Sequence, residues 1–90
     1  MDLTVCIPSY NDSSNLDNLL ESISKNQTDD LDYEIIVCDS DSDDDTEIVI
    51  RNWQRFLPIV YKKSFKGASA SINLNKGIDL AKGKIFCRID

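Results

Sequence analysis

Four short apolar segments are spaced along the chain, at residues 3–7, 34–38, 59–61 and 84–89. Segments of this length without regular polar alternation are typical of strands buried on both faces, as in a parallel sheet. Pro8 follows the first segment, and proline lacks the N–H that a strand interior needs. The pattern therefore predicts four strands, the first of which ends at Pro8.

Between these segments the apolar residues recur every three or four positions, which is the spacing of one buried helix face. The three stripes are Leu16, Leu19, Leu20 and Ile23, then Ile48, Val49, Trp53, Phe56 and Leu57, and finally Leu74, Ile78 and Ala81. We expect Ser13 or Ser14 to cap the first helix and Gly83 to end the third. The large aromatic residues of the second stripe, Trp53 and Phe56, are expected in the core.

A strand–helix unit repeated three times and closed by a strand is the pattern of a doubly wound α/β fold. We predict a Rossmann-like, three-layer α/β/α arrangement whose parallel sheet of about four strands has the order 3-2-1-4. Its crevice lies at the carboxyl ends of the strands, and Pro8–Asn11, Asp39 with its loop, and Asp90 should line it. Residues 1–90 should form a single partial domain, because most complete α/β enzymes are longer.

The net charge of -6 is unevenly distributed along the chain. Lys25 is the only basic residue before Arg51, whereas Asp79 and Asp90 are the only acidic residues after it. The acidic balance argues against a nucleic-acid binder. An acidic half and a basic half suit a site that holds a cation together with a polyanion, such as a metal–diphosphate. They suit equally well two faces of one domain that attract each other.

Cys6, Cys38 and Cys87 lie singly inside apolar segments, which indicates thiols in a reducing compartment instead of a disulfide framework. The absence of histidine excludes a Ser-His or Cys-His nucleophile and a His-ligated zinc. No apolar segment has the length of a membrane span, and no secretory leader opens the chain. We expect a cytoplasmic protein, with any membrane association belonging to a longer chain of which these residues would be a part.

The strand at 34–38 runs directly into the most acidic segment of the chain, Asp39-Ser40-Asp41-Ser42-Asp43-Asp44-Asp45-Thr46. An EF-hand is excluded because Asp44 stands where that loop needs glycine and Ile50 where it needs glutamate. A magnesium-dependent phosphotransfer domain remains an alternative, with Asp39 as nucleophile and Asp41 as acid. A third interpretation is that Asp39 accepts a hydrogen bond from a base or a ribose hydroxyl.

The turn after the first strand lacks the G-x-G-x-x-G sequence that cradles a diphosphate in dinucleotide folds. A nucleoside diphosphate would therefore need a divalent metal and basic side chains. Asp90 is the candidate metal-binding carboxylate, and Lys66 is a candidate basic side chain.

An ordered set of short motifs resembles the start of family 2 glycosyltransferases. The motifs are Val5-Cys6-Ile7-Pro8-Ser9-Tyr10-Asn11, Glu34-Ile35-Ile36-Val37-Cys38-Asp39 with Ser42-x-Asp44-x-Thr46, Lys66-Gly67-x-Ser69 with Asn73, Gly77-Ile78, Ala81-x-Gly83, and Ile89-Asp90. They cover essentially the whole chain, and their order makes the set specific where one motif alone would be weak. That family comprises inverting nucleotide-sugar transferases with the Rossmann-like GT-A fold, so the resemblance implies a truncated GT-A domain.

The resemblance implies roles in binding a UDP-sugar. Pro8 and Tyr10 would wall the base pocket, with the tyrosine ring stacked on or beside uracil. Asp39 would accept the uracil N3–H, and Asp90 would approach the ribose and a diphosphate held by Mn²⁺ or Mg²⁺. The expected nucleotide-binding residues are Pro8, Tyr10, Asn11, Asp39, Lys66 and Asp90, with Asp90 also as a metal ligand.

Two positions depart from the family pattern. Ser40-Asp41 stands where the family commonly has aspartate-glycine, so this turn needs another conformation. Ile72 replaces the usual arginine, which leaves Lys66 or Lys76 as candidates for the diphosphate contact.

The resemblance also implies what lies outside these residues. The half that binds a glycan or lipid-linked acceptor, and the catalytic base, are expected beyond residue 90, so the isolated chain should be inactive. We expect Asp44 or Thr46 to cap the second helix instead of binding a ligand. The competing hypothesis is a non-catalytic nucleotide-binding or protein-interaction module that uses the acidic segment as a charged face.

Overall fold

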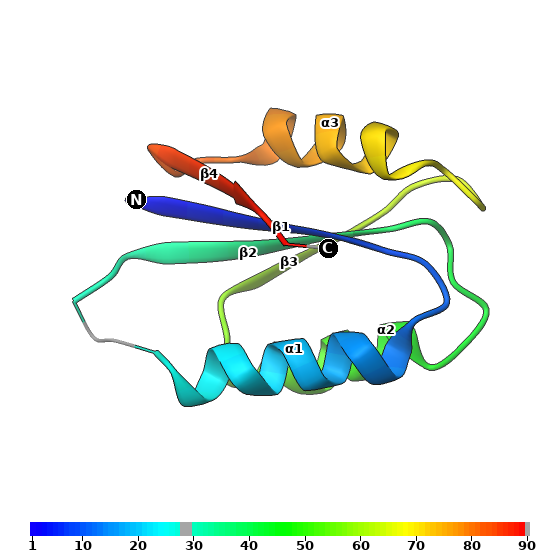
Figure 1. The fold of residues 1–90 in the computed structure, drawn as a ribbon, viewed down its shortest axis with the longest axis horizontal. Coiled ribbons are helices and arrows are strands. Elements are labelled where there is room, and N and C mark those ends of the chain that lie inside the picture. The colour runs from blue at the N-terminus through cyan, green and yellow to red at the C-terminus, as the bar shows by residue number, and fades with distance from the viewer. Residues whose placement is uncertain (28–29, 90) are drawn as a thin grey trace.

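The computed structural model describes residues 1–27 and 30–89 and contains a four-stranded parallel sheet. Along the chain the elements are β1 (Leu3–Ser9), α1 (Ser13–Lys25), β2 (Tyr33–Asp39), α2 (Thr46–Trp53), β3 (Ile59–Lys63), α3 (Ala70–Leu80) and β4 (Ile85–Arg88). The strand order is β3-β2-β1-β4, with α1 and α2 on one face and α3 on the other (Figure 1). The predicted doubly wound topology is therefore confirmed. No helix in the described part of the chain is long and apolar enough to cross a membrane.

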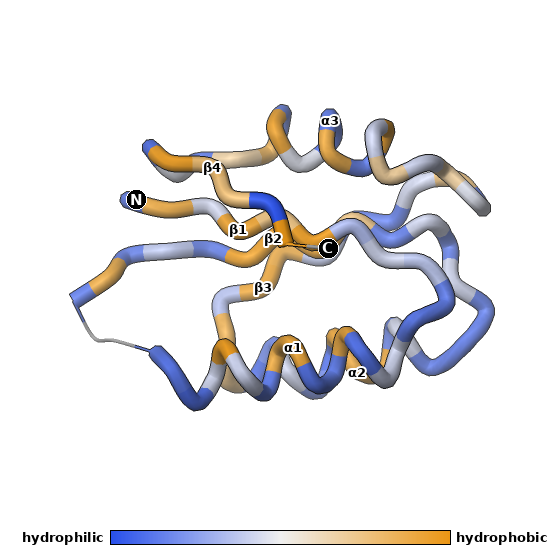
Figure 2. Tube along the Cα trace, viewed as in Figure 1, coloured by the Kyte–Doolittle hydropathy of each residue, from blue (hydrophilic) through white to orange (hydrophobic). Residues whose placement is uncertain are grey.

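The main core lies between the sheet and the layer formed by α1 and α2. Figure 2 shows apolar positions of α1 turned toward the sheet. The buried members of this core are Val5, Ile7, Leu16, Leu20, Ile35, Val37, Ile50, Leu57 and Ile59. Because successive side chains of a strand point to opposite faces, the residues between them on β1 and β2 face α3.

α3 meets its face of the sheet through small and polar residues. Its buried residues are Asn73 and Gly77, whereas Ile78 is 56% exposed. A Cβ at Gly77 would stand 2.4 Å from Cys6 Sγ, so the close approach of α3 requires glycine there. The predicted buried stripe was wrong at Ile78, because the helix packs with the side that carries Asn73 and Gly77, whereas Leu74 and Ala81 are half-buried.

Two details of α1 and α2 also differ from the expectations. Asp12 holds the N-cap position of α1, just before the predicted serines. Phe56 is 68% exposed and not in the core, because α2 ends before it. Trp53 packs partly buried against the core, and its indole N–H donates to Asp17 Oδ1 on α1 at 2.7 Å.

A buried polar network fixes the turn that leads into β4. Oε2 of the buried Glu34 accepts hydrogen bonds from Thr4 Oγ1 and from the Lys82 N–H, both at 2.7 Å. The Gly83 N–H donates to Thr4 Oγ1 at 2.9 Å, and a Cβ at Gly83 would stand 2.5 Å from the backbone of β1. These contacts set the direction in which β4 runs toward the carboxyl end of the sheet.

Candidate functional site

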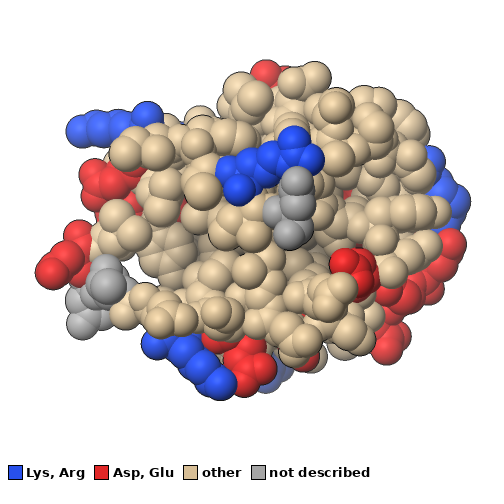
Figure 3. Space-filling view, viewed as in Figure 1, with Lys and Arg blue, Asp and Glu red and all other residues tan. Residues whose placement is uncertain are grey.

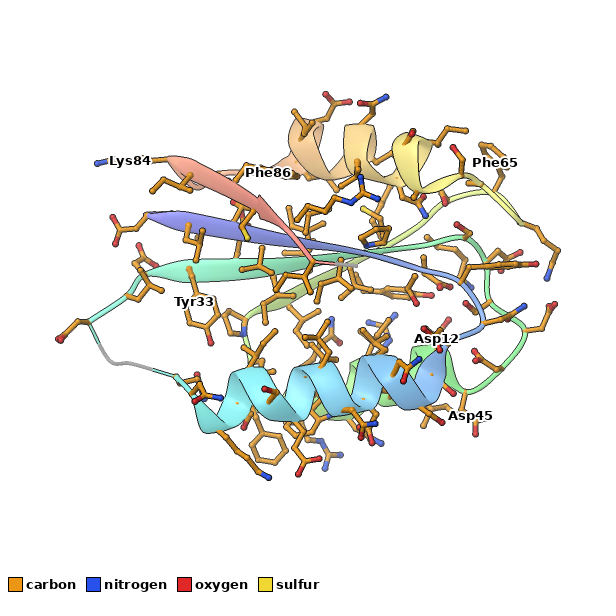
Figure 4. The ribbon with its side chains drawn as sticks, viewed as in Figure 1. Asp12, Tyr33, Asp45, Phe65, Lys84 and Phe86 are labelled. Atoms are coloured by element: carbon orange, nitrogen blue, oxygen red, sulfur yellow. The ribbon has the colours of Figure 1, made fainter. Side chains whose placement is uncertain are left out.

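A cavity of about 160 Å³ opens where β1 and β2 end, beside the start of α3; we call it the strand-end cavity. It is lined by Pro8, Ser9, Tyr10, Ser40, Ala68, Ala70 and Asn73. Figure 4 shows that the same end of the molecule carries the starts of α1 and α2, marked by Asp12 and Asp45, and the loop with Phe65. A cavity therefore lies at the predicted edge of the sheet, and its lining includes Pro8, Ser9 and Tyr10 of the residues expected there.

Tyr10 lies on the rim of the strand-end cavity and is 44% exposed. The next residue, Asn11, has a positive φ of 48°, which asparagine tolerates better than most residues. Its N–H donates to Ser42 Oγ at 2.8 Å, and its Oδ1 accepts from the Asp43 N–H at 2.7 Å. Asn11 thus connects the loop after β1, which carries Tyr10 and is called the Tyr10 loop below, to the loop after β2. Asn11 is not among the residues that line the cavity.

Asp39 does not line the strand-end cavity. Its side chain follows the alternation of Ile35 and Val37 toward the α1–α2 side, and it is 1% exposed. Oδ1 accepts from Ser42 Oγ at 2.6 Å, and Oδ2 accepts from the Ser42 N–H at 2.9 Å. A contact between Asp39 and a base would require the buried carboxylate to become accessible, and it stays a prediction.

The residue after β2 that lines the cavity is Ser40. Its hydroxyl donates to Ala68 O and accepts from Asn73 Nδ2, both at 2.7 Å. Asn73 Oδ1 in turn accepts from Ser64 Oγ at 2.7 Å. These hydrogen bonds hold the start of α3 against the end of β2. Ser40 was not among the predicted site residues. The alternation of side chains along a strand could have identified it, because this alternation places Ser40 and Asp39 on opposite faces of the sheet.

The acidic segment is partly neutralised by lysines from the basic half of the chain. Lys63 Nζ lies 3.7 Å from Asp41 Oδ1 and 3.2 Å from Glu47 Oε1. Lys66 donates to Asp43 Oδ1 and, at 3.1 Å, to Asp41 O, and the bond to Asp43 raises the pKa of Lys66. Acidic side chains gather at the right of Figure 3, with basic ones beside them. An ammonium group has three N–H donors, so its two hydrogen bonds leave Lys66 one donor for a diphosphate.

Asp44 joins the first turns of α1 and α2. Its Oδ2 accepts from the Ser13 N–H at 3.1 Å, and its Oδ1 accepts from the N–H of Thr46 at 3.1 Å and from the Thr46 hydroxyl. These hydrogen bonds, chiefly the one from the Thr46 hydroxyl, lower the pKa of Asp44. Asp45 holds the N-cap position of α2 without a side-chain cap. Asp44 thus accepts hydrogen bonds from the first turns of both helices, although the next residue, Asp45, holds the N-cap position of α2.

The acidic segment is a poor fit for the expected Mn²⁺ or Mg²⁺. No group of three or more Asp, Glu, Cys or His side chains that could hold a metal ion occurs among residues 1–27 and 30–89. Asp39 and Asp44 are engaged by hydrogen bonds, and Asp41 and Asp43 by lysines. Asp90, the predicted metal ligand and diphosphate contact, lies outside the described residues.

A larger cavity of about 280 Å³ lies on the α1 side of the end of β1. It is lined by Ile7, Pro8, Ser9, Tyr10, Asp12, Asn15, Leu16 and Leu19. Ser9 Oγ is buried here without a hydrogen-bond partner in the described part of the chain. The lining of this cavity includes the carboxylate of Asp12, whereas the described lining of the strand-end cavity includes no carboxylate and contains the start of α3, so the strand-end cavity suits a diphosphate better.

Comparison with known proteins identifies relatives across nearly the whole chain. The model of the family described as Glycosyl transferase family 2 matches residues 4–90. The abequosyltransferase RfbV of Salmonella typhimurium is 34% identical over 89 residues, which cover 97% of this chain and 26% of that protein. The chain spans about a quarter of the length of this relative.

Solved structures show the same fold. S. aureus TarS 1-349 in complex with UDP-GlcNAc has a TM-score of 0.87 at 22% identity, over 98% of this chain and 26% of that one. The mannosyltransferase PcManGT from Pyrobaculum calidifontis, in complex with GDP-Man and Mn²⁺, has a TM-score of 0.82 at 26% identity, over 93% of this chain and 25% of that one.

Proposed function

The chain belongs to glycosyl transferase family 2, and from this we propose that it is the nucleotide-sugar-binding part of a glycosyltransferase whose donor is a UDP-sugar. The observation that carries the proposal is the strand-end cavity, which has Tyr10 on its rim and the first residue of α3, Ala70, in its wall. The complex of TarS with UDP-GlcNAc supports a uridine nucleotide.

Tyr10 and Pro8 are the proposed contacts of the base. A half-exposed aromatic ring at a cavity rim offers a face on which a base can stack. Asn11 acts indirectly, because its hydrogen bonds to the loop after β2 hold the Tyr10 loop in place. Asp39 accepts a hydrogen bond from Ser42, and Ser42 accepts one from the Asn11 N–H. Asp39 therefore helps to hold the same loop indirectly. A direct contact of Asp39 with the base stays a prediction.

The start of α3 is the proposed place of the diphosphate. Ser69 caps this helix by accepting the Ile72 N–H at 3.2 Å, and Ala70 lines the cavity. Free N–H groups and the positive end of the helix dipole favour an anion at this position. Lys66, whose ammonium group is bound to Asp43 and to Asp41 O, is the proposed cationic contact through its third N–H donor.

A divalent ion, Mn²⁺ or Mg²⁺, would offset the charge of the diphosphate, and the complex of PcManGT with GDP-Man and Mn²⁺ supports its use. Asp90 is its proposed ligand. The hydroxyl of a glycan or lipid-linked acceptor would attack the anomeric carbon with inversion, and a carboxylate outside residues 1–90 would take its proton. We propose a place in polysaccharide biosynthesis, on the cytoplasmic side, and little or no turnover by the isolated chain.

An NMR titration with UDP and with ADP, each with and without Mg²⁺, tests the donor site. UDP should shift the amides of Tyr10, Ser40 and Ala70 at lower concentration than ADP does. Tyr10→Ala should weaken UDP binding roughly 5- to 100-fold, the range of one lost base–aromatic stack. Phe56→Ala is the matched control, because Phe56 is an exposed ring near the start of β3.

Shifts with neither nucleotide would contradict the donor site and favour the protein-interaction module. Equal weakening by Tyr10→Ala and Phe56→Ala would argue against stacking on Tyr10. Turnover of a UDP-sugar by the 90-residue chain at an ordinary enzymatic rate would contradict the expected inactivity.

A further inference from the structure

The strand-end cavity is lined by two groups of residues from different parts of the chain. Figure 1 shows the start of α3 at the same end of the molecule as the loops after β1 and β2. One group lies at the end of β1 and contains the proposed base contacts, Pro8 and Tyr10. The other group, which we call the α3 lining, consists of Ser40, Ala68, Ala70 and Asn73. The proposed place of the diphosphate is in the α3 lining, so the base and the diphosphate would meet different segments of the chain.

The side chain of Asn73 connects the members of the α3 lining. Its Nδ2 donates to Ser40 Oγ, and its Oδ1 accepts from Ser64 Oγ, both at 2.7 Å. Ser40 Oγ in turn donates to Ala68 O at 2.7 Å. Asn73 is 1% exposed, and both ends of its amide are engaged. This one amide therefore ties α3 to the residue after β2 and to the loop after β3.

Asn73 also belongs to the first turn of α3, where N–H groups lack carbonyl partners within the helix. Ser69 accepts two of these N–H groups, that of Ile72 on its Oγ at 3.2 Å and that of Asn73 on its carbonyl oxygen at 3.1 Å. The N–H groups of Ala70 and Ser71 have no hydrogen-bond partner among the described residues. Their position relative to the cavity depends on how this turn is held, and the Asn73 amide is what ties the turn to the strands.

We propose that Asn73 is a positioning residue for the diphosphate of the donor, an inference that rests on the UDP-sugar function proposed above. Asn73 does not touch the ligand, because its amide is buried and already paired. It fixes the start of α3 beside the cavity, where free N–H groups and the helix dipole favour an anion. A site that is already ordered loses less affinity to the ordering of its parts. Loss of the Asn73 amide should therefore weaken the hold on the diphosphate more than the hold on the nucleoside.

NMR titration of the 90-residue chain with UDP and with uridine, in buffer without divalent ions, tests this role. The UDP-to-uridine affinity ratio measures what the diphosphate contributes. Asn73→Ala should lower this ratio roughly 3- to 10-fold, the effect of one lost hydrogen bond, and should change the affinity for uridine less. Asn75→Ala is the matched control, because Asn75 lies on the same helix with its side chain exposed, and it should leave the ratio unchanged.

Ser64 offers a second, milder test of the same amide. Ser64→Ala removes the donor to Asn73 Oδ1 and should lower the ratio in the same direction by a smaller factor. Ser64→Thr keeps the hydroxyl and should restore the ratio toward that of the wild type. This pair of variants decides the matter if Asn73→Ala does not fold.

Equal weakening of UDP and uridine in Asn73→Ala and in Ser64→Ala would overturn the positioning role and leave a merely structural one, with the UDP-sugar site still in place. A wild-type ratio of one would overturn the role in the same way, because the diphosphate would then contribute nothing. Binding of neither ligand to a wild-type chain that shows a cooperative thermal transition would overturn the proposed function, and the inference with it.

Discussion

The hydroxyl of Ser42 donates to Asp39 Oδ1 at 2.6 Å while it accepts the N–H of Asn11 at 2.8 Å. One side chain thus links the buried carboxylate at the end of β2 to the loop after β1. That loop carries Tyr10, the proposed stacking partner of the base. A hydrogen bond to a carboxylate is stronger than one between neutral groups, so Ser42 should hold this loop firmly.

Replacing Ser42 with alanine should weaken UDP binding roughly 3- to 10-fold, because the loss of this hydrogen-bonding hydroxyl loosens the Tyr10 loop. Calorimetric titration measures the affinity, and the Tyr10 amide signal in NMR reports the loop. Ser42→Thr keeps the hydroxyl and should bind UDP nearly as the wild type does. Unchanged affinity in Ser42→Ala would show that the link does not position Tyr10.

Asp44→Ala should lower the free energy of unfolding at neutral pH by about 1–2 kcal/mol, because its carboxylate serves the first turns of two helices. Folding lowers the pKa of Asp44, so its ionised form stabilises the fold. This contribution is present above the ordinary carboxyl pKa and disappears as the pH falls through the lowered pKa of the folded state. Urea denaturation at several pH values should show the difference from the wild type shrinking in acid.

Asp45→Ala is the control for Asp44, because Asp45 holds the N-cap position of α2 without a side-chain hydrogen bond. It should cost less than Asp44→Ala at neutral pH. Equal losses from the two variants would mean that general charge, and not the contacts with Ser13 and Thr46, is responsible.

Glu34→Ala should destabilise the chain by about 2–3 kcal/mol, since it leaves Thr4 Oγ1 and the Lys82 N–H without their acceptor in a buried place. Glu47→Ala is the comparison, because it removes an exposed ion pair with Lys63 and should cost less than about 1 kcal/mol. Chemical denaturation measures both. If the two glutamates proved equally important, the turn into β4 would not depend on the buried network.

Gly77→Ala should destabilise the fold by about 1–3 kcal/mol even though alanine is the better helix former. The new Cβ would stand 2.4 Å from Cys6 Sγ, whereas its distance to Cys6 Cβ would be an ordinary 3.5 Å. Cys6→Ala removes the sulfur, so the double variant should lose less stability than the sum of the two single variants. Additive losses in this double-mutant cycle would rule out the contact as the cause.

The elements and their order could be predicted from the sequence because the signals are local. The apolar runs mark the strands, and the stripe of Leu16, Leu19, Leu20 and Ile23 marks α1. The strand order then follows from the repeated strand–helix unit, since the crossover rules allow few arrangements. The place of the site, at the carboxyl ends of β1 and β2, followed from that order.

The faces of α2 and α3 could not be predicted in the same way. Phe56 fits the periodicity of the α2 stripe, but the helix ends before it. Ile78 fits the stripe of α3, but Gly77 is the residue that reaches Cys6 on β1. For α3 the deciding contact is with Cys6, which lies far away along the chain, whereas for Phe56 the deciding feature is the residue at which α2 ends.

The sequence by itself determined the fold class, the sheet order and the edge where the strand-end cavity lies, because strand and helix periods are properties of neighbouring residues. Only the tertiary structure decided what the acidic segment does. In the folded chain Asp39 accepts a hydrogen bond from Ser42, and Asp44 accepts hydrogen bonds from the first turns of two helices. Ser40 lines the strand-end cavity. The reason is physical: a carboxylate binds whichever donors the fold brings within hydrogen-bonding distance, and Ser13, one donor to Asp44, lies 31 positions away in the chain.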